Sequence, residues 1–209
     1  MKQGRFIALE GGEGAGKSTQ YRLQAGALRA KGLEVVVTRE PGGTPGAEAV
    51  RALLLGLEGD GWHPRAEALL FAAARSDHVE RLIRPSLEAG KWVICDRFLD
   101  SSRAYQGGGS GLRDAEILEL HRIGSEGLLP DATLLVEVDP DEVRRRLALR
   151  DGDGADRIGG RASEYHARVS AAFSSFAAQD PARFRRIDGN GDPGTIHGRI
   201  MASLAPELA

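Results

Sequence analysis

Residues 11–18 form a glycine-rich segment, Gly-Gly-Glu-Gly-Ala-Gly-Lys-Ser, with the spacing of a phosphate-binding loop. The apolar run at 5–10 precedes it and predicts a buried strand, and the helical pattern of 18–30 follows it. In this context glycines let successive backbone N–H groups turn toward phosphate oxygens, and the positive end of the helix dipole faces the same anion. The segment therefore predicts an α/β protein that binds a nucleoside triphosphate.

The polar residues of this loop have separate predicted roles. Lys17 is expected to reach the β- and γ-phosphates from an exposed loop position, and Ser18 to bind Mg²⁺. Asp96 follows the apolar strand predicted at 91–95, where P-loop enzymes place a second acidic metal ligand, although a strand-end aspartate can also simply cap a turn. The predicted triphosphate-binding residues are Gly11, Gly12, Glu13, Gly14, Ala15, Gly16, Lys17, Ser18 and Thr19.

Strand and helix patterns alternate along the rest of the chain. Apolar runs predict further strands, and helical periodicity predicts helices, at 34–38 (strand), 48–57 (helix), 64–89 (helix), 113–126 (helix), 132–138 (strand), 141–149 (helix), 163–178 (helix), 184–187 (strand) and 193–204 (helix). Pro85 is expected to bend or split the helix at 64–89, and the glycine-rich stretch 106–111 to be a flexible connection at a pocket edge. The alternation predicts a P-loop NTPase-type three-layer fold, with a parallel sheet of about five strands and helices on both faces. No repeat or boundary divides the chain, so 1–209 is expected to be a single domain.

Charge and composition restrict the cellular compartment and the binding partners that we expect for this protein. The 28 basic and 30 acidic residues give a net charge of −2, which argues against a general nucleic-acid binder and predicts local phosphate recognition. Cys95 is the only cysteine, so a disulfide within the chain is excluded, as is typical of a reducing cytoplasm. The N-terminal residues show no signal-peptide pattern, and no apolar run approaches the roughly 20 residues of a membrane span. We therefore expect a cytoplasmic protein with no membrane partner.

Four motifs, in order along the chain, resemble those of the thymidylate kinase family. They are the segment 10–19, Thr-Arg-Glu-Pro-Gly-Gly-Thr at 38–44, Asp-Arg-Phe at 96–98, and Ser-Ser-Arg-Ala-Tyr-Gln-Gly at 101–107. The first alone identifies only a phosphate loop, whereas the second and fourth at these separations are specific. The resemblance covers nearly the whole chain. It implies the nucleoside-monophosphate-kinase form of the fold, a homodimer, and transfer of phosphate from ATP to dTMP with Mg²⁺.

The resemblance also implies where the acceptor binds. Arg39 and Arg97 lie just beyond predicted strand ends and are expected to face the acceptor phosphate. Phe71 is expected to stack on thymine, and Arg75, four residues further on the same helix face, to hydrogen-bond its carbonyl. Ser102 stands where the family often has threonine, which keeps the hydroxyl and loses the methyl group. The residues implied to bind dTMP are Glu13 (near the 3′-hydroxyl), Arg39, Phe71, Arg75, Arg97, Ser101, Ser102, Tyr105 and Gln106.

Acceptor chemistry of this kind needs no general base. A phosphomonoester has a second pKa of about 6 and is mostly dianionic at neutral pH. The enzyme must position two anions, neutralise their charge and exclude water. The scattered histidines are therefore expected to be packing or surface residues, and the sequence shows no activating pair of obvious spacing.

Transfer develops negative charge that an arginine commonly stabilises. Residues 13–15 contain no arginine, so by resemblance it comes from a short lid at about 150–161, which is rich in Gly, Asp and Arg. Arg150 ranks first, Arg157 second and Arg146 third, and the alternative is a charged loop that pairs with its own aspartates. With Lys17 and Arg97, Arg150 and Arg157 are the predicted catalytic residues.

Two other functions remain open from the residues alone. One is a kinase of the same fold that acts on a deoxynucleoside or on another nucleoside monophosphate, which an acceptor screen would distinguish. The other is a nucleotide-binding regulator without acceptor chemistry. The constellation of Arg39, Phe71 and Arg75 argues against a regulator, because a nucleotide switch needs no second pocket. ADP release measured with and without dTMP separates the two classes.

Overall fold

The computed structural model describes residues 4–57, 61–150 and 163–208. Five parallel strands form a sheet in the order β2-β3-β1-β4-β5. The strands are β1 (Phe6–Glu10), β2 (Val35–Arg39), β3 (Trp92–Asp96), β4 (Ala132–Glu137) and β5 (Phe184–Asp188). The predicted strands and their parallel arrangement are thus confirmed, and the phosphate loop leaves the central strand.

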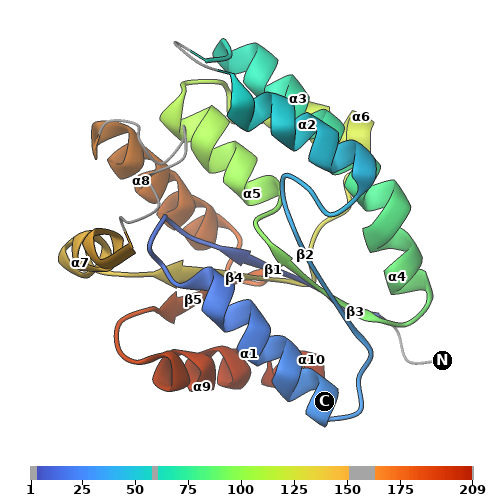
Figure 1. The fold of residues 1–209 in the computed structure, drawn as a ribbon, viewed down its shortest axis with the longest axis vertical. Helices are drawn as coiled ribbons and strands as arrows, with labels where there is room; N and C mark the ends of the chain where they lie inside the picture. The colour runs from blue at the N-terminus through green and yellow to red at the C-terminus, as the bar shows by residue number, and fades with distance from the viewer. Residues whose placement is uncertain (1–3, 58–60, 151–162, 209) are drawn as a thin grey trace.

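Helices cover both faces of this sheet (Figure 1). They are α1 (Lys17–Ala30), α2 (Pro45–Gly56), α3 (Pro64–His78), α4 (Arg84–Glu88), α5 (Leu99–Ser102), α6 (Asp114–Ser125), α7 (Pro140–Arg150), α8 (Ser163–Gln179), α9 (Pro193–Ser203) and α10 (Ala205–Leu208), with π-helical segments η1 (Val79–Ile83) and η2 (Arg103–Gly109). None of the helices in the described ranges is long and apolar enough to span a membrane.

Alternate residues of β1 pack into two separate hydrophobic cores, one on each face of the sheet. Ile7 and Leu9 pack with α1 and α9 on one face, and Phe6 and Ala8 pack with α3, η1 and α6 on the other. A third cluster joins η2, α8 and β5 through Tyr105. Burial on both faces explains why the strands read as continuous apolar runs rather than as alternating patterns.

One helix boundary differs from the sequence-based prediction, whereas the expected break near Pro85 is observed. The predicted helix at 64–89 is interrupted before Pro85 by η1, in which the N–H of Arg84 donates to the carbonyl of Val79, five residues back. Helix α2 begins at Pro45, earlier than predicted, because Thr44 caps it by accepting a hydrogen bond from the N–H of Ala47. The short loop 41–44 is therefore held tightly between β2 and α2.

The prediction of a flexible connection at 106–111 is wrong for most of that stretch. Residues 99–109 are helical through α5 and η2, and the glycines lie where α8 packs most closely. A Cβ atom on Gly109 would lie 2.5 Å from the ring of Tyr165, and Arg168 donates to the Gly109 carbonyl. Glycine here serves close helix packing rather than mobility.

Candidate active site

The phosphate loop occupies the space between β1 and α1 that the sequence predicts. Gly11 has φ +136°, and a Cβ atom there would collide with the carbonyl oxygen of Val136 on β4. Gly16, at φ +81°, is the N-cap of α1 and carries no side chain over the helix end. The N–H groups at the start of α1 therefore remain open toward an anion beside the loop.

Lys17 is buried, contrary to the expectation of an exposed loop position. It is the first residue of α1, is only 7% exposed, and its Nζ donates to the carbonyls of Gly11 and Gly12 at 3.1 and 3.0 Å. Burial, together with the nearby Arg97 guanidinium, lowers the pKa of Lys17 to about 8. The loop thus holds a desolvated positive charge against its own backbone.

Asp96 ends β3 in register with Leu9 of β1 and Arg39 of β2. Its Oδ1 atom is buried and has no hydrogen-bond partner within the described part of the chain, whereas Ser18 is exposed at the start of α1. An acidic oxygen without a partner, on the strand that pairs with the strand before the phosphate loop, suits a cation that also binds phosphate oxygens. These two residues therefore fit the predicted Mg²⁺ ligands.

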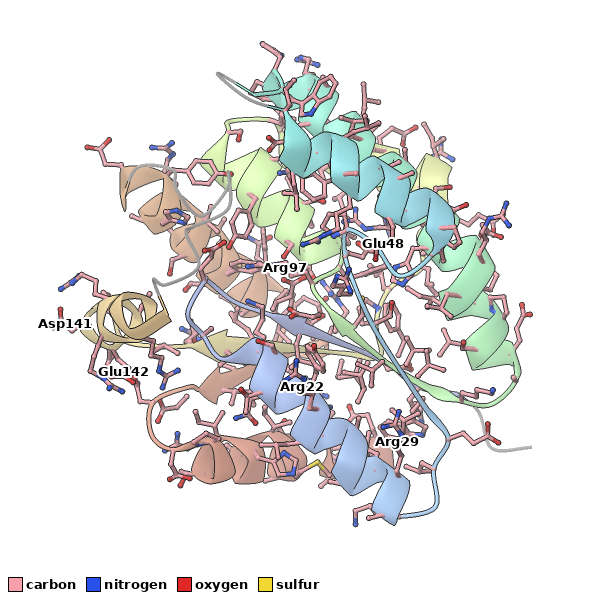
Figure 2. The ribbon with its side chains drawn as sticks, viewed as in Figure 1. Arg22, Arg29, Glu48, Arg97, Asp141 and Glu142 are labelled. Carbon is pink, nitrogen blue, oxygen red and sulfur yellow. The ribbon has the colours of Figure 1, made fainter. Side chains whose placement is uncertain are left out.

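Arg97 follows Asp96 in a left-handed backbone conformation, with φ +67°. Its Nη1 donates to the Gly11 carbonyl at 3.2 Å and to Ser101 Oγ at 3.1 Å, and its guanidinium lies 4.9 Å from the centre of the Tyr105 ring. Figure 2 shows Arg97 beside α5, near the loop that joins β1 to α1. One guanidinium therefore contacts both the phosphate loop and the helix that carries Ser101.

A cavity of about 180 Å³ lies next to Arg97 and brings all the predicted acceptor residues together. Its lining includes Glu13, Arg39, Phe71, Arg75, Arg97, Ser101, Ser102, Tyr105 and Gln106, along with Asp96. The remaining lining residues had no role predicted from the sequence; they are Glu40, Pro41, Arg51, Leu55 and Phe98. Of these, Glu40 and Pro41 lie within the motif at 38–44 and Phe98 within the motif at 96–98, and motif membership was the only signal for them.

Arg75 is held from two sides within this cavity. Its Nε donates to Glu40 Oε2 at 2.8 Å, its Nη2 donates to Ser102 Oγ at 2.8 Å, and the Arg75 side chain is 3% exposed. These contacts from the described residues engage Nε and Nη2, which leaves Nη1 for a ligand. Gln106 is fixed in a similar way, because its amide donates to the buried Glu67 at 2.9 Å.

Arg39 differs from the buried arginines. Its side chain is 53% exposed and pairs at 2.9 Å with Glu48 of α2, whose carboxylate also accepts a hydrogen bond from the N–H of Gly43. An exposed pair of this kind contributes little to stability, so Arg39 can exchange Glu48 for an anionic ligand at small cost.

Glu10, at the end of β1, is a structural residue that the sequence analysis did not single out. Its carboxylate accepts hydrogen bonds from the N–H groups of Phe98 and Ser101 and from Ser101 Oγ, at 2.6–3.0 Å. Burial raises the pKa of Glu10 to about 7, and Asp100 acts in the same direction. Glu10 therefore links the strand before the phosphate loop to α5 through three hydrogen bonds.

A second cavity, of about 680 Å³, lies on the other side of the phosphate loop. It is lined by Gly16 and Thr19 of the loop and α1, by Arg146 of α7, and by Asn190 after β5. Arg146 donates to the carbonyls of Gly14 and Gly189 at 3.4 and 3.0 Å. The third-ranked arginine is thus placed against the loop, whereas Arg157 and the side chain of Arg150 lie outside the described residues.

Proteins similar in sequence to this chain support the same interpretation of the site. A family model described as thymidylate kinase matches residues 9–200. A thymidylate kinase of Rhizorhabdus wittichii is 56% identical over 205 residues, which cover 98% of this chain and 99% of the relative. One of Gluconobacter oxydans is 47% identical over 210 residues, covering 99% of this chain and 96% of the relative.

A solved structure supports the same assignment. The thymidylate kinase from Ehrlichia chaffeensis superimposes with a TM-score of 0.79 at 33% sequence identity, and the match covers 97% of this chain and 99% of the other. Fold, cavity lining and sequence similarity over almost the full length agree. The chain therefore belongs to the thymidylate kinase family.

Proposed function

We propose that the 180 Å³ cavity binds dTMP and that the loop at residues 11–18 presents the γ-phosphate of ATP to it, so that the chain forms dTDP and ADP. Family membership implies this reaction. The observation that carries the assignment of the site is Arg97, whose guanidinium contacts the phosphate loop at Gly11 and the acceptor cavity at Ser101. A group in that position can neutralise donor and acceptor phosphates at once.

Within the cavity, different residues bind the base and the phosphate of dTMP. Phe71 offers a ring for stacking on thymine, and Arg75 offers Nη1 as a donor to a thymine carbonyl. Arg39 and Arg97 bind the phosphate of dTMP, and Glu13 lies at the loop side, where it accepts the 3′-hydroxyl of the sugar. Ser101, Ser102, Tyr105 and Gln106 complete the walls. Because the acceptor is already an anion, these residues need only orient it.

Mg²⁺ is the proposed cofactor, and Ser18 and Asp96 are its proposed ligands. The buried Oδ1 of Asp96 has no hydrogen-bond partner among the described residues and is therefore available to bind the ion. When bound there, Mg²⁺ would supply positive charge against the phosphates during transfer. On the donor side, Lys17 and the backbone of residues 11–19 hold the triphosphate. Arg150 and Arg157 remain proposed lid arginines, and Arg146, already beside Gly14, is positioned to approach the same phosphates.

The proposed assembly is a homodimer in the cytoplasm, formed by one domain that includes its lid. Exposed apolar side chains on three neighbouring helices support the dimer, since large apolar residues gathered on a surface commonly mark an interface. They are Leu53 of α2, Leu69 of α3, and Leu118 and Ile123 of α6, each at least 40% exposed.

An acceptor screen tests the proposed function. With ATP and Mg²⁺, we expect the highest kcat/KM for dTMP, a value about ten-fold lower for dUMP, and a much lower one for CMP. One methyl group contributes only about 1–3 kcal/mol of discrimination, whereas cytosine would set its amino group against the donors of Arg75 in a buried site. A coupled assay of ADP formation measures all three. Equal kcat/KM for dTMP and CMP would refute the assignment of the base pocket.

A further inference from the structure

Behind the proposed acceptor pocket runs a buried chain of polar side chains from β2 to α5. Thr38 Oγ1 lies 2.7 Å from His78 Nε2, and His78 Nδ1 lies 3.0 Å from Glu40 Oε1. The other oxygen of Glu40 accepts from Arg75 Nε, and Arg75 Nη2 donates to Ser102 Oγ, both at 2.8 Å. Thr38, His78, Glu40 and Arg75 are each at most 8% exposed.

The charge of Glu40 decides which atom donates in its hydrogen bond with His78. As the ion-pair partner of Arg75, the Glu40 carboxylate only accepts hydrogen bonds, so His78 Nδ1 must carry a proton. At its other ring nitrogen, Nε2, His78 shares a hydrogen bond with the hydroxyl of Thr38. Both oxygens of Glu40 are thereby fixed, one by His78 and one by Arg75.

Fixing both oxygens restricts the guanidinium of Arg75. If His78 did not hold Oε1, the carboxylate could turn and present both oxygens to Arg75 as a fork, which is a favourable geometry for arginine. The guanidinium would then turn away from Ser102 and from the base. His78 is on α3, one turn beyond Arg75, and it is completely buried, so it has no route to a ligand of its own.

The loop at residues 41–44 lies over these buried polar side chains and leaves room for the contact between Thr38 and His78. Gly43 has φ +90°, and a Cβ atom there would collide with Thr38 Oγ1 and lie 2.7 Å from His78 Nε2. The tight turn at 41–44, which belongs to the motif at 38–44, thus leaves space for the contact between threonine and histidine.

From this arrangement we infer that His78 is a positioning residue for acceptor selection. His78 orients Glu40, and Glu40 in turn orients the Arg75 guanidinium that is proposed to hydrogen-bond the base. The inference rests on the proposed acceptor pocket. It assigns a function to a histidine that the chemistry of transfer does not need, and it predicts an effect on dTMP binding with little effect on ATP.

Two amide substitutions divide the contacts of His78. Asparagine can place its amide nitrogen near the position of Nδ1 and keep the hydrogen bond to Glu40, whereas glutamine can reach the position of Nε2 and keep only the contact with Thr38. We expect His78→Gln to raise the KM for dTMP about ten-fold, since a hydrogen bond to a charged group contributes about 1.5–3 kcal/mol. The ratio of kcat/KM for dTMP to that for CMP should fall as well, while the KM for ATP changes less than about two-fold. His78→Asn should recover most of both losses.

The thermal unfolding midpoints of both variants provide the folding control. If His78→Gln is too unstable to assay, Thr38→Val, which keeps the shape and removes the hydroxyl, should raise the KM for dTMP in the same direction by a smaller factor. Equal KM values for dTMP in the Asn and Gln variants, or equal losses toward dTMP and ATP, would overturn the inference. Failure of the proposed function would appear differently, as wild-type protein that forms no ADP in response to dTMP.

Discussion

Replacing Lys17 with methionine is expected to lower kcat by about 10²-fold or more, because a fixed charge at the transferring phosphate typically contributes that much to the rate. Lys17 belongs to the loop itself and donates to two of the loop carbonyls, those of Gly11 and Gly12. Methionine retains the length and apolar volume of the side chain but carries no charge. Steady-state rates at saturating ATP and dTMP measure the effect.

The burial of Lys17 makes methionine a better test than alanine. Alanine would leave a gap beside the loop, whereas methionine fills it and removes a charge that burial disfavours, as the lowered pKa of about 8 shows. We expect the unfolding midpoint of Lys17→Met to be at least that of the wild type, and that of Lys17→Ala to be lower. A methionine variant that retains more than about a tenth of wild-type kcat would contradict the role of Lys17.

Replacing Arg97 with alanine is expected to reduce kcat/KM for dTMP by about 10²–10³-fold. The substitution removes the contacts with Gly11 and Ser101 and the stacking on Tyr105, so both the loop and the acceptor cavity lose the same group. Arg97→Lys should recover only part of this loss, because an ammonium cannot contact the loop and the acceptor phosphate with the geometry of a planar guanidinium.

The backbone of Arg97 provides a matched control. At φ +67° a non-glycine residue carries a conformational cost of about 1–2 kcal/mol. Arg97→Gly removes the same charge and also relieves this strain. We therefore expect the glycine and alanine variants to lose activity equally, with the glycine variant unfolding at the higher denaturant concentration. Activity that differs in parallel with stability would show that Arg97 acts on the fold rather than on the phosphates.

Local patterns were enough to predict the sheet and the phosphate loop. β1 and β3 are short apolar runs that end in the polar residues the site uses, and burial on both faces leaves no ambiguity about their type. The resemblance to the family then implied nine acceptor residues, and the structure gathers them around one cavity. These features are carried by residues close together in sequence, so sequence reasoning reaches them.

Features that depend on distant partners were missed or mistaken. The glycines at 107–109 have low helix propensity, and only contact with α8 explains why they are helical. Glu10 and Glu40 are buried acids whose partners lie 88–91 and 35–38 residues away, so no local pattern predicts them. Lys17 is predicted to be exposed because it lies in a loop, but in the fold its ammonium group is buried against the carbonyls of Gly11 and Gly12.

We propose that one cavity, between Arg75 and Arg97, presents dTMP to the phosphate loop. A crystal structure of the chain with dTMP, Mg²⁺ and a non-hydrolysable ATP analogue would show whether it does. We expect thymine against Phe71 and Arg75, the dTMP phosphate on Arg97, and the γ-phosphate of the analogue beside Lys17. Binding of dTMP outside this cavity, or with its phosphate directed away from Lys17, would refute this assignment of the acceptor site.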